Sequence, residues 1–162
     1  MNNQCFGLIK AKEQIYDPMG FAVIDVVKSS ESVEYDAHTF LLNEKRVIFR
    51  MAKITPTKIG QFVTFWKRIN GVTAPYDAAD NFDLFVVSVS NKDRIGQFVF
   101  SKEVLIKHGI VSVNQIGGKR AIRVYPAWDT PDNKQVKRTQ IWQLNYFFEV
   151  DAHKDFTRGL YF

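Results

Sequence analysis

The chain has 162 residues, of which 46% are hydrophobic and 24% charged, and its formal net charge is +5. This length and composition predict a single globular domain spanning residues 1–162 and exclude a disordered or low-complexity chain. The sequence contains no secretory signal pattern and no run of about 18 apolar residues, so we expect a cytoplasmic protein with no membrane partner.

The N-terminal residues predict a helix. Apolar side chains recur at helical spacing over the first fifteen residues, and the pattern ends at Asp17-Pro18-Met19-Gly20. Phe21–Val27 follows and is apolar and β-branched, which is typical of a strand or of the end of an irregular segment.

An antiparallel hairpin is expected next. Residues 33–41 alternate between apolar and polar side chains, and residues 45–54 return the chain after a turn. The half-polar face of the second strand would present Arg46 and Arg50 to solvent, about two pleats apart.

A second helix is predicted to begin at Thr55-Pro56, because Thr can cap free amides and Pro at the first helical position loses no hydrogen bond. Ile59, Phe62, Val63 and Trp66 fall at helical spacing, and Asn70-Gly71 supplies a left-handed stop. The polar side of this helix would carry Lys58, Lys67 and Arg68.

The rest of the chain predicts further strands and helices. Phe82–Val89 is an almost continuous apolar run, which indicates a central strand buried on both faces. The later predictions are a strand at Gly96–Phe100, a helix at Lys102–His108 capped by Ser101, a strand at Lys119–Tyr125 and a helix at Asp132–Glu149. The fold class is therefore α+β, with a mixed β-sheet flanked by helices.

One pentapeptide, Ile-Gly-Gln-Phe-Val, occurs at Ile59–Val63 and again at Ile95–Val99. The first copy lies in the helical pattern and the second in a strand pattern, and the flanking residues do not match. We interpret the repeat as coincidence.

Positive charge is concentrated in two segments. Residues 45–68 contain seven basic residues and no acidic one, and residues 119–138 contain six basic residues and two acidic ones. Binding of a polyanion would relieve the electrostatic repulsion within each segment. The alternative interpretation is that each segment forms a solvated basic surface without a partner. The sequence thus favours binding of nucleic acid.

Aromatic residues accompany the second basic segment. Tyr125 shares a strand face with Lys119 and Arg123, and Trp128 follows in the next loop, although Trp128 can equally be a core residue. Aromatic rings beside cations suit unstacked bases, so we expect RNA and single-stranded DNA as partners, duplex DNA more weakly, and little sequence specificity. The predicted nucleic-acid-binding residues are Arg46, Arg50, Lys53, Lys58, Lys67, Arg68, Lys119, Arg120, Arg123, Tyr125, Trp128, Lys134, Lys137 and Arg138.

Four stretches of the chain resemble the MepB family, which takes its name from a multidrug-efflux operon. They are Tyr35–Phe40, Val47–Arg68, Gly96–Phe100 and Gly118–Asp129. The resemblance implies a fold similar to the PD-(D/E)XK endonuclease core, and the strand, strand, short helix order at Phe82–His108 is compatible with it.

Nucleases of that type need an Asp at one strand end and an acidic-x-Lys triplet on the neighbouring strand, which together hold Mg²⁺ and activate water. Asp83, or Asp80, can fill the first place, but Gln97 and Val99 stand where the acid and the Lys are required. The chain's one acidic-x-Lys triplet, Asp132-Asn133-Lys134, lies at a predicted helix start, where a carboxylate is explained by the helix dipole. We therefore expect no metal, no catalytic residue and no enzyme activity.

Other cofactor signals are missing. His38, His108 and His153 are far apart and lack metal-ligand spacing, and no glycine-rich phosphate loop occurs, so no cofactor is expected. Two alternatives to nucleic-acid binding stay open: an active Mg²⁺-dependent nuclease with an unconventional site near Asp83, and a protein-binding module that uses the basic surface.

Overall fold

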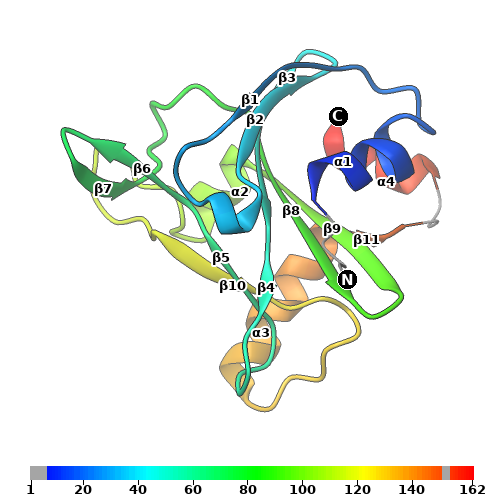
Figure 1. Cartoon of the computed structure of the whole chain (residues 1–162). Coiled ribbons are helices and arrows are strands. Elements are labelled where there is room, and N and C mark those ends of the chain that lie inside the picture. The colour runs from blue at the N-terminus through cyan, green and yellow to red at the C-terminus, as the bar shows by residue number, and fades with distance from the viewer. Residues whose placement is uncertain (1–6, 151–153) are drawn as a thin grey trace.

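The computed structural model describes residues 7–150 and 154–162 (Figure 1). Its strands are β1 (Val23–Lys28), β2 (His38–Leu42), β3 (Lys45–Met51), β4 (Lys53–Ile54), β5 (Gln61–Thr64), β6 (Trp66–Ile69), β7 (Val72–Pro75), β8 (Leu84–Asn91), β9 (Arg94–Ser101), β10 (Ala121–Val124) and β11 (Phe147–Glu149). Its helices and helical turns are α1 (Leu8–Ala11), η1 (Lys12–Tyr16), η2 (Val33–Tyr35), α2 (Lys102–Lys107), α3 (Lys134–Gln143), η3 (Leu144–Tyr146) and α4 (Lys154–Tyr161).

The main sheet has six strands in the order β1-β2-β3-β8-β9-β11. Strands β3 and β8 are parallel and every other neighbouring pair is antiparallel, so the sheet is mixed. The predicted α+β class with a mixed sheet and flanking helices is confirmed. The expected hairpin is present as β2 and β3, which pair with His38 opposite Phe49. Its first strand begins at His38 and not at residue 33, because Val33–Tyr35 forms the helical turn η2.

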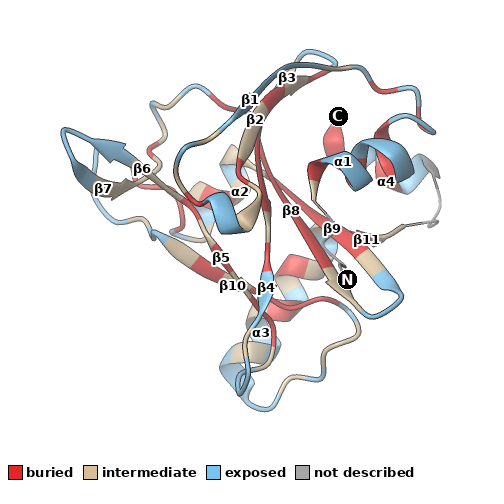
Figure 2. Cartoon of the chain, viewed as in Figure 1, coloured by how far each residue is buried: buried red, intermediate tan, exposed pale blue. Residues whose placement is uncertain are grey.

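Strand β8 is central because its side chains enter two different cores. Leu84 and Val86 pack on one face of the sheet, and Phe85, Val87 and Val89 pack on the other. Figure 2 shows β8 and the inner part of β9 as almost entirely buried. The apolar run that predicted a strand covered on both faces is explained by this position.

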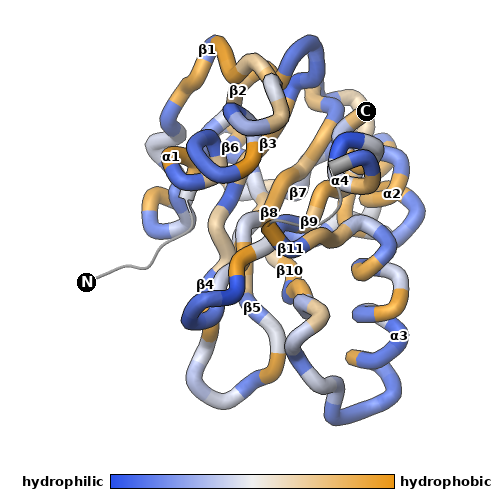
Figure 3. Tube along the Cα trace, turned by 90° about the vertical axis from the view of Figure 1, so that its right-hand side faces the viewer, coloured by the Kyte–Doolittle hydropathy of each residue, from blue (hydrophilic) through white to orange (hydrophobic). Residues whose placement is uncertain are grey.

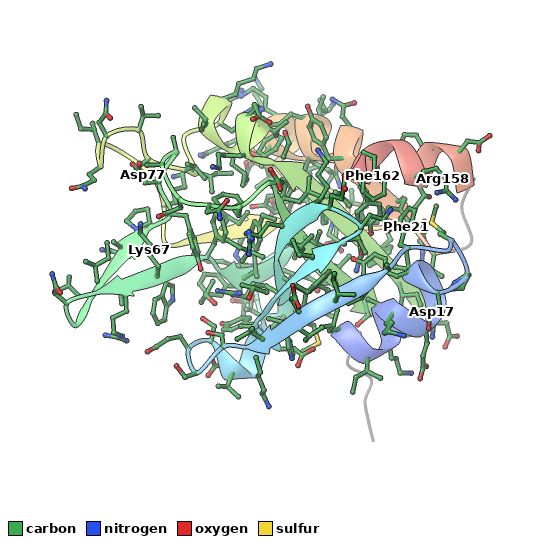
Figure 4. The ribbon with its side chains drawn as sticks, turned by 90° about the horizontal axis from the view of Figure 1, so that it is seen from above. Asp17, Phe21, Lys67, Asp77, Arg158 and Phe162 are labelled. Atoms are coloured by element: carbon green, nitrogen blue, oxygen red, sulfur yellow. The ribbon has the colours of Figure 1, made fainter. Side chains whose placement is uncertain are left out.

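The first face of the main sheet is covered by α1, η1 and α4. Tyr16 and Tyr161 are fully buried there, and their hydroxyl groups both donate hydrogen bonds to the side-chain oxygen of Gln97. Figure 4 shows the C-terminal residue Phe162 beside Phe21, and their ring centroids are 5.0 Å apart. The C-terminal helix is therefore anchored at this end of the molecule.

The second face is covered by a small sheet, in the order β10-β5-β4, and by helices α2 and α3. Val63, Ile122 and Val124 point from the small sheet into the core that it shares with the main sheet. Figure 3 shows α3 as a largely hydrophilic helix on the outside of this layer. The small sheet thus has one buried face and one face directed away from the core.

The helix predicted from Thr55-Pro56 to Asn70-Gly71 is wrong. Those residues form β5 and β6, and Asn70-Gly71 is the turn into β7, with φ angles of 51° and 80°. Gln61, Val63 and Phe65 are buried while the residues between them are half-exposed, so burial has the period of a strand. The helical spacing of the apolar residues was a coincidence within a run of aromatic and β-branched residues, which favour strands. Figure 1 shows β6 and β7 projecting as a two-stranded arm.

Other boundaries differ by smaller amounts. The last predicted helix ends at Gln143, and Phe147–Glu149 instead pairs with β9 as an edge strand. Helix α2 is capped as expected, since the Ser101 hydroxyl accepts a hydrogen bond from the Val104 amide. The first six residues of the predicted N-terminal helix and His153 lie outside the described residues. None of the described helices is long and apolar enough to cross a bilayer.

Candidate nucleic-acid interface

The outward face of the small sheet carries a row of alternating cations and an aromatic ring. Lys53 on β4 is the cross-strand partner of Phe62 on β5, and Phe62 is in turn the partner of Arg123 on β10. Neighbouring strands lie about 4.8 Å apart, so the Cα atoms of Lys53 and Arg123 are about 10 Å apart with the Phe62 ring between them. The row joins the two basic segments of the sequence on one surface.

Tyr35 adds a second ring to this row. It projects from η2, and its ring centroid lies 6.3 Å from that of Phe62. The Lys53 ammonium lies 5.1 Å from the Tyr35 ring centroid, and the Arg123 guanidinium carbon lies 6.0 Å from the Phe62 centroid. Burial, together with the charge of Glu34, raises the pKa of Tyr35 above its ordinary value. We call Tyr35, Lys53, Phe62 and Arg123 the cation–aromatic row.

Arg123 also fixes the loop between β4 and β5. Its Nη1 donates hydrogen bonds to the carbonyl oxygens of Ile59 and Gly60, both at 3.2 Å, and its Nη2 donates to the Thr55 hydroxyl. Gly60 has a φ of +83°, and a Cβ at this position would lie 2.6 Å from the Tyr125 ring. The loop, which carries the exposed Lys58, is therefore held against the end of the row.

Most of the predicted cations are exposed. Those with exposed side chains and no ion pair among residues 7–150 and 154–162 are Arg46, Lys53, Lys58, Lys119, Arg120, Lys134, Lys137 and Arg138. Arg123 is half-buried, and in the same part of the chain it has no carboxylate partner either. This positive charge is not compensated within the described molecule.

Two predicted cations are neutralised by carboxylates. The Lys67 ammonium lies 2.6 Å from a carboxylate oxygen of Asp80, and Arg68 forms an ion pair with Glu31. The hydrogen bond from Arg68 lowers the pKa of Glu31 and raises that of Arg68. Figure 4 shows Lys67 at the arm end of the molecule. The β6–β7 arm therefore offers less net positive charge than its sequence indicates.

The expected exposure of Arg50 is wrong, because its side chain is only 2% exposed. Arg50 points to the same face of β3 as Ile48, whereas Phe49 points to the opposite face. The small sheet covers the face that carries Ile48 and Arg50. The Arg50 Nη1 donates to the Phe49 carbonyl oxygen at 3.0 Å, while its Nε has no hydrogen-bond partner. Burial lowers the pKa of Arg50, and an interaction with the Tyr76 hydroxyl opposes that shift. A side chain buried in this way leaves little surface for a bound phosphate to contact.

Tyr125 and Trp128 are largely used in packing. Tyr125 is 8% exposed and its ring lies against Gly60. Trp128 is half-buried against Phe147, with ring centroids 5.9 Å apart, and Arg94 lies over it at 5.1 Å. Trp128 therefore takes the core-packing role that the sequence left open.

A hollow of about 300 Å³ continues from the row along the edge of β10 that faces away from β5. Its lining includes His108, Lys119, Arg123, Tyr125, Thr139 and Trp142. Sequence reasoning missed Tyr35, Phe62, His108 and Trp142, because each is brought to this surface by an element distant in the chain. The aromatic content of 14% was the one available signal, and it does not locate any ring.

The structure also revises which residues lie beside Asp83. Leu84 is opposite Ser101, and the Lys102 amide donates to the Asp83 carbonyl oxygen at 3.1 Å. The triplet at that strand end is therefore Phe100-Ser101-Lys102, whereas Gln97 lies opposite Ser88, far along β8. Phe100, two residues before Lys102, is fully buried in the core.

The acids near this strand end bond to protein groups. The Asp83 carboxylate accepts the Arg46 amide at 2.8 Å, and Asp80 holds Lys67. Asp77 accepts hydrogen bonds from the Ser112 hydroxyl and the Gln115 amide, and these bonds lower the pKa of Asp77 to about 2. Among the residues that the structure describes, no three His, Cys, Asp or Glu side chains are grouped to hold a metal ion.

Comparison with known proteins identifies the chain's relatives. The family model described as MepB-like matches residues 29–149. A protein whose structure is described as the crystal structure of MepB is 36% identical, with a TM-score of 0.78 over 81% of this chain and 89% of that one. A bacterial homing endonuclease, I-Ssp6803I, is 18% identical, with a TM-score of 0.45 over 83% of this chain and 85% of that one. No curated protein matches significantly. The family predicted from the sequence motifs is confirmed: the chain belongs to the MepB-like family.

Proposed function

We propose that this protein binds single-stranded nucleic acid, RNA or single-stranded DNA, across the cation–aromatic row. The observation that carries the proposal is the cross-strand order Lys53, Phe62, Arg123, with Tyr35 against Phe62. Phosphates of the bound strand would contact the cations while bases stack on the rings.

The charge around the row supports this function. Lys58, Lys119 and Arg120 are exposed near the ends of β5 and β10 and lack carboxylate partners among the described residues. A strand that contacts such side chains releases condensed counterions, so its affinity falls as salt rises. Binding is therefore expected to depend steeply on ionic strength.

The arrangement favours a single strand over a duplex and gives little sequence specificity. Bases stacked inside a closed duplex cannot reach the faces of Tyr35 and Phe62, whereas unpaired bases can. Every base has a face that can stack, so the rings discriminate weakly among sequences. Duplex DNA would be held by phosphate contacts alone.

We also propose that binding is not followed by cleavage. The strand position that would supply a second metal-binding carboxylate beside Asp83 is occupied by the buried ring of Phe100. The Asp83 carboxylate already accepts the Arg46 amide. A single carboxylate that is engaged in this way is a weak ligand for Mg²⁺, which needs near-octahedral oxygen coordination.

The proposal is tested by titrating labelled single-stranded RNA, single-stranded DNA and duplex DNA of one length and sequence at several salt concentrations. The single strands should bind more tightly than the duplex, and binding should weaken as salt rises. The double variant Lys53→Glu, Lys58→Glu should bind more weakly and with a shallower salt dependence. The log–log slope should fall by about 0.7 for each phosphate that the variant no longer neutralises.

The matched control is Lys12→Glu, which reverses an exposed charge on the opposite side of the main sheet. It should bind like the parent protein. Affinity that does not change with salt, or equal losses in the control and in the double variant, would contradict binding at this row. Cleavage in Mg²⁺ or Mn²⁺ that disappears in Asp83→Ala would refute the non-enzymatic part of the proposal.

A further inference from the structure

The hollow beside β10 has features that binding along the cation–aromatic row does not use. It lies on the edge of β10 opposite β5, between the end of α2 and one side of α3. Arg123 belongs both to the row and to the lining of the hollow, so the two surfaces are continuous. At about 300 Å³ the hollow is at the lower end of the size range of small-ligand pockets.

One wall of the hollow is a stacked pair of rings. The imidazole of His108 and the indole of Trp142 are nearly parallel, with centroids 3.7 Å apart and an interplanar angle of 6°. Phe100 contacts Trp142 from the core, with centroids 5.6 Å apart, and holds the indole in place. Burial and the neighbouring charge of Lys107 lower the pKa of His108, which favours the uncharged ring. Both rings line the hollow, so this wall is aromatic.

The edge of β10 in the hollow is closed to another strand. The Gln143 side-chain oxygen accepts the Tyr125 amide at 2.8 Å, and its side-chain nitrogen donates to the Arg123 carbonyl oxygen at 3.0 Å. Gln143 thus takes the place of a neighbouring strand over these two residues. A peptide cannot extend the sheet here, so the hollow suits a compact ligand rather than a β-strand.

The rim of the hollow is cationic and contains hydroxyl groups. Arg123 lies on β10 and Lys119 lies two residues before that strand. Tyr125 and Thr139 contribute hydroxyl groups. Arg138 lies one helical turn before Trp142 on α3, at the i and i+4 positions that share a helix face. None of the lining residues is acidic. The pKa of Tyr125 is raised, mainly by burial; the charge of Arg123 lowers it and the charge of Asp132 raises it.

We propose that this hollow is a nucleotide pocket, which receives one unstacked nucleotide of the bound strand with its base against the His108–Trp142 stack and its phosphate on Lys119. The assignment rests on the proposed function, since the nucleotide enters as part of the strand that crosses the cation–aromatic row. It extends that function, because a free mononucleotide should also bind in the pocket without the rest of the strand.

The test uses calorimetric titration of the full chain with three probes: adenosine monophosphate, ribose phosphate and adenosine. Adenosine monophosphate should bind more tightly than either fragment, because only it offers both the ring and the phosphate. His108→Ala and Lys119→Gln should each weaken it about tenfold, and His108→Phe, which keeps a ring in the stack, should restore most of the affinity. Lys12→Gln, far from the pocket, is the control, and the imidazole resonances of His108 should shift on binding.

Each probe outcome decides the assignment. Equal affinity for adenosine monophosphate and ribose phosphate would overturn the assignment, because the base would then contribute nothing to binding. No mononucleotide binding, or full affinity in folded His108→Ala, would overturn it as well. Oligonucleotide binding separates the two proposals: a salt-dependent affinity that His108→Ala leaves unchanged would refute the pocket alone, while mononucleotide binding without oligonucleotide binding would refute the row alone.

Discussion

Lys53 and Arg123 lie on the two sides of Phe62 in one cross-strand row, although 70 positions separate them in the chain. The pairing of β5 with both β4 and β10 produces this relationship. It converts two separate basic segments into one surface and places a ring between two cations that lack carboxylate partners among the described residues.

The rings of the row should contribute affinity without affecting the salt dependence. Phe62→Leu, which keeps most of the side-chain volume, should weaken binding of single strands by about 1–3 kcal/mol, because one base loses its stacking partner. The slope of affinity against salt should stay at the parent value, since no phosphate contact changes. Phe156→Leu removes an exposed ring from α4 and serves as the control in the same titrations. Equal losses in both variants would argue against stacking on Phe62.

Arg50 should act on stability and not on binding. Its guanidinium is buried and has an unsatisfied Nε, and a buried donor without a partner costs about 1–3 kcal/mol. Arg50→Met should therefore raise the free energy of unfolding, by about 1 kcal/mol in urea denaturation, and leave the salt dependence of binding unchanged. Arg46→Met changes an exposed residue of the same strand and should alter stability by less than about 0.5 kcal/mol. A shallower salt slope in folded Arg50→Met would show that this residue does contact phosphate.

Gly60 and Gly71 should differ in their tolerance of a side chain. Both have a φ near +80°, but a Cβ at Gly60 meets the Tyr125 ring and the Val124 carbonyl oxygen, while at Gly71 nothing lies within 4 Å. Gly71→Ala should cost about 1 kcal/mol of stability from backbone strain alone. Gly60→Ala should cost about 2–4 kcal/mol, because overpacking adds to the strain, and should also weaken nucleic-acid binding by displacing the loop that Arg123 holds. Similar melting temperatures for the two variants would contradict the contact with Tyr125.

Asp77 should make the folded state sensitive to acid. Its pKa is lowered to about 2 in the folded protein, from an ordinary value of 3.8, so the folded state favours the ionised carboxylate. The stabilisation is complete above the unfolded value and is lost as the pH falls towards 2. Asp77→Asn should lower the melting temperature at neutral pH, and the gap to the parent protein should narrow as the pH falls from about 5 to about 2. The control is Asp93→Asn in the exposed β8–β9 turn, and a gap that is constant with pH would contradict the proposed hydrogen bonding.

The pentapeptide Ile-Gly-Gln-Phe-Val shows where local sequence stopped being informative. We expected a helix at its first copy and a strand at its second, yet β5 begins inside the first copy and β9 contains the second. Gly60 in the first copy has a φ of +83°, which makes a turn, whereas Gly96 lies within the extended strand β9. The same five residues therefore meet different neighbours, and tertiary packing overrides their intrinsic preference.

The sequence by itself determined the elements whose signal is local. The apolar run at Phe82–Val89 indicated a covered strand, Ser101 predicted the start of the helix that follows it, and the alternation before Asn43 predicted the first hairpin. The family motifs were specific enough to place the chain. It also identified Lys53 and Arg123 by charge. Only the tertiary structure decided that Arg50 is buried, that Lys67 and Arg68 are neutralised, and that Tyr35, Phe62, His108 and Trp142 line the surface. Burial and ion pairing depend on which strand or helix covers a residue, and those neighbours come from distant parts of the chain.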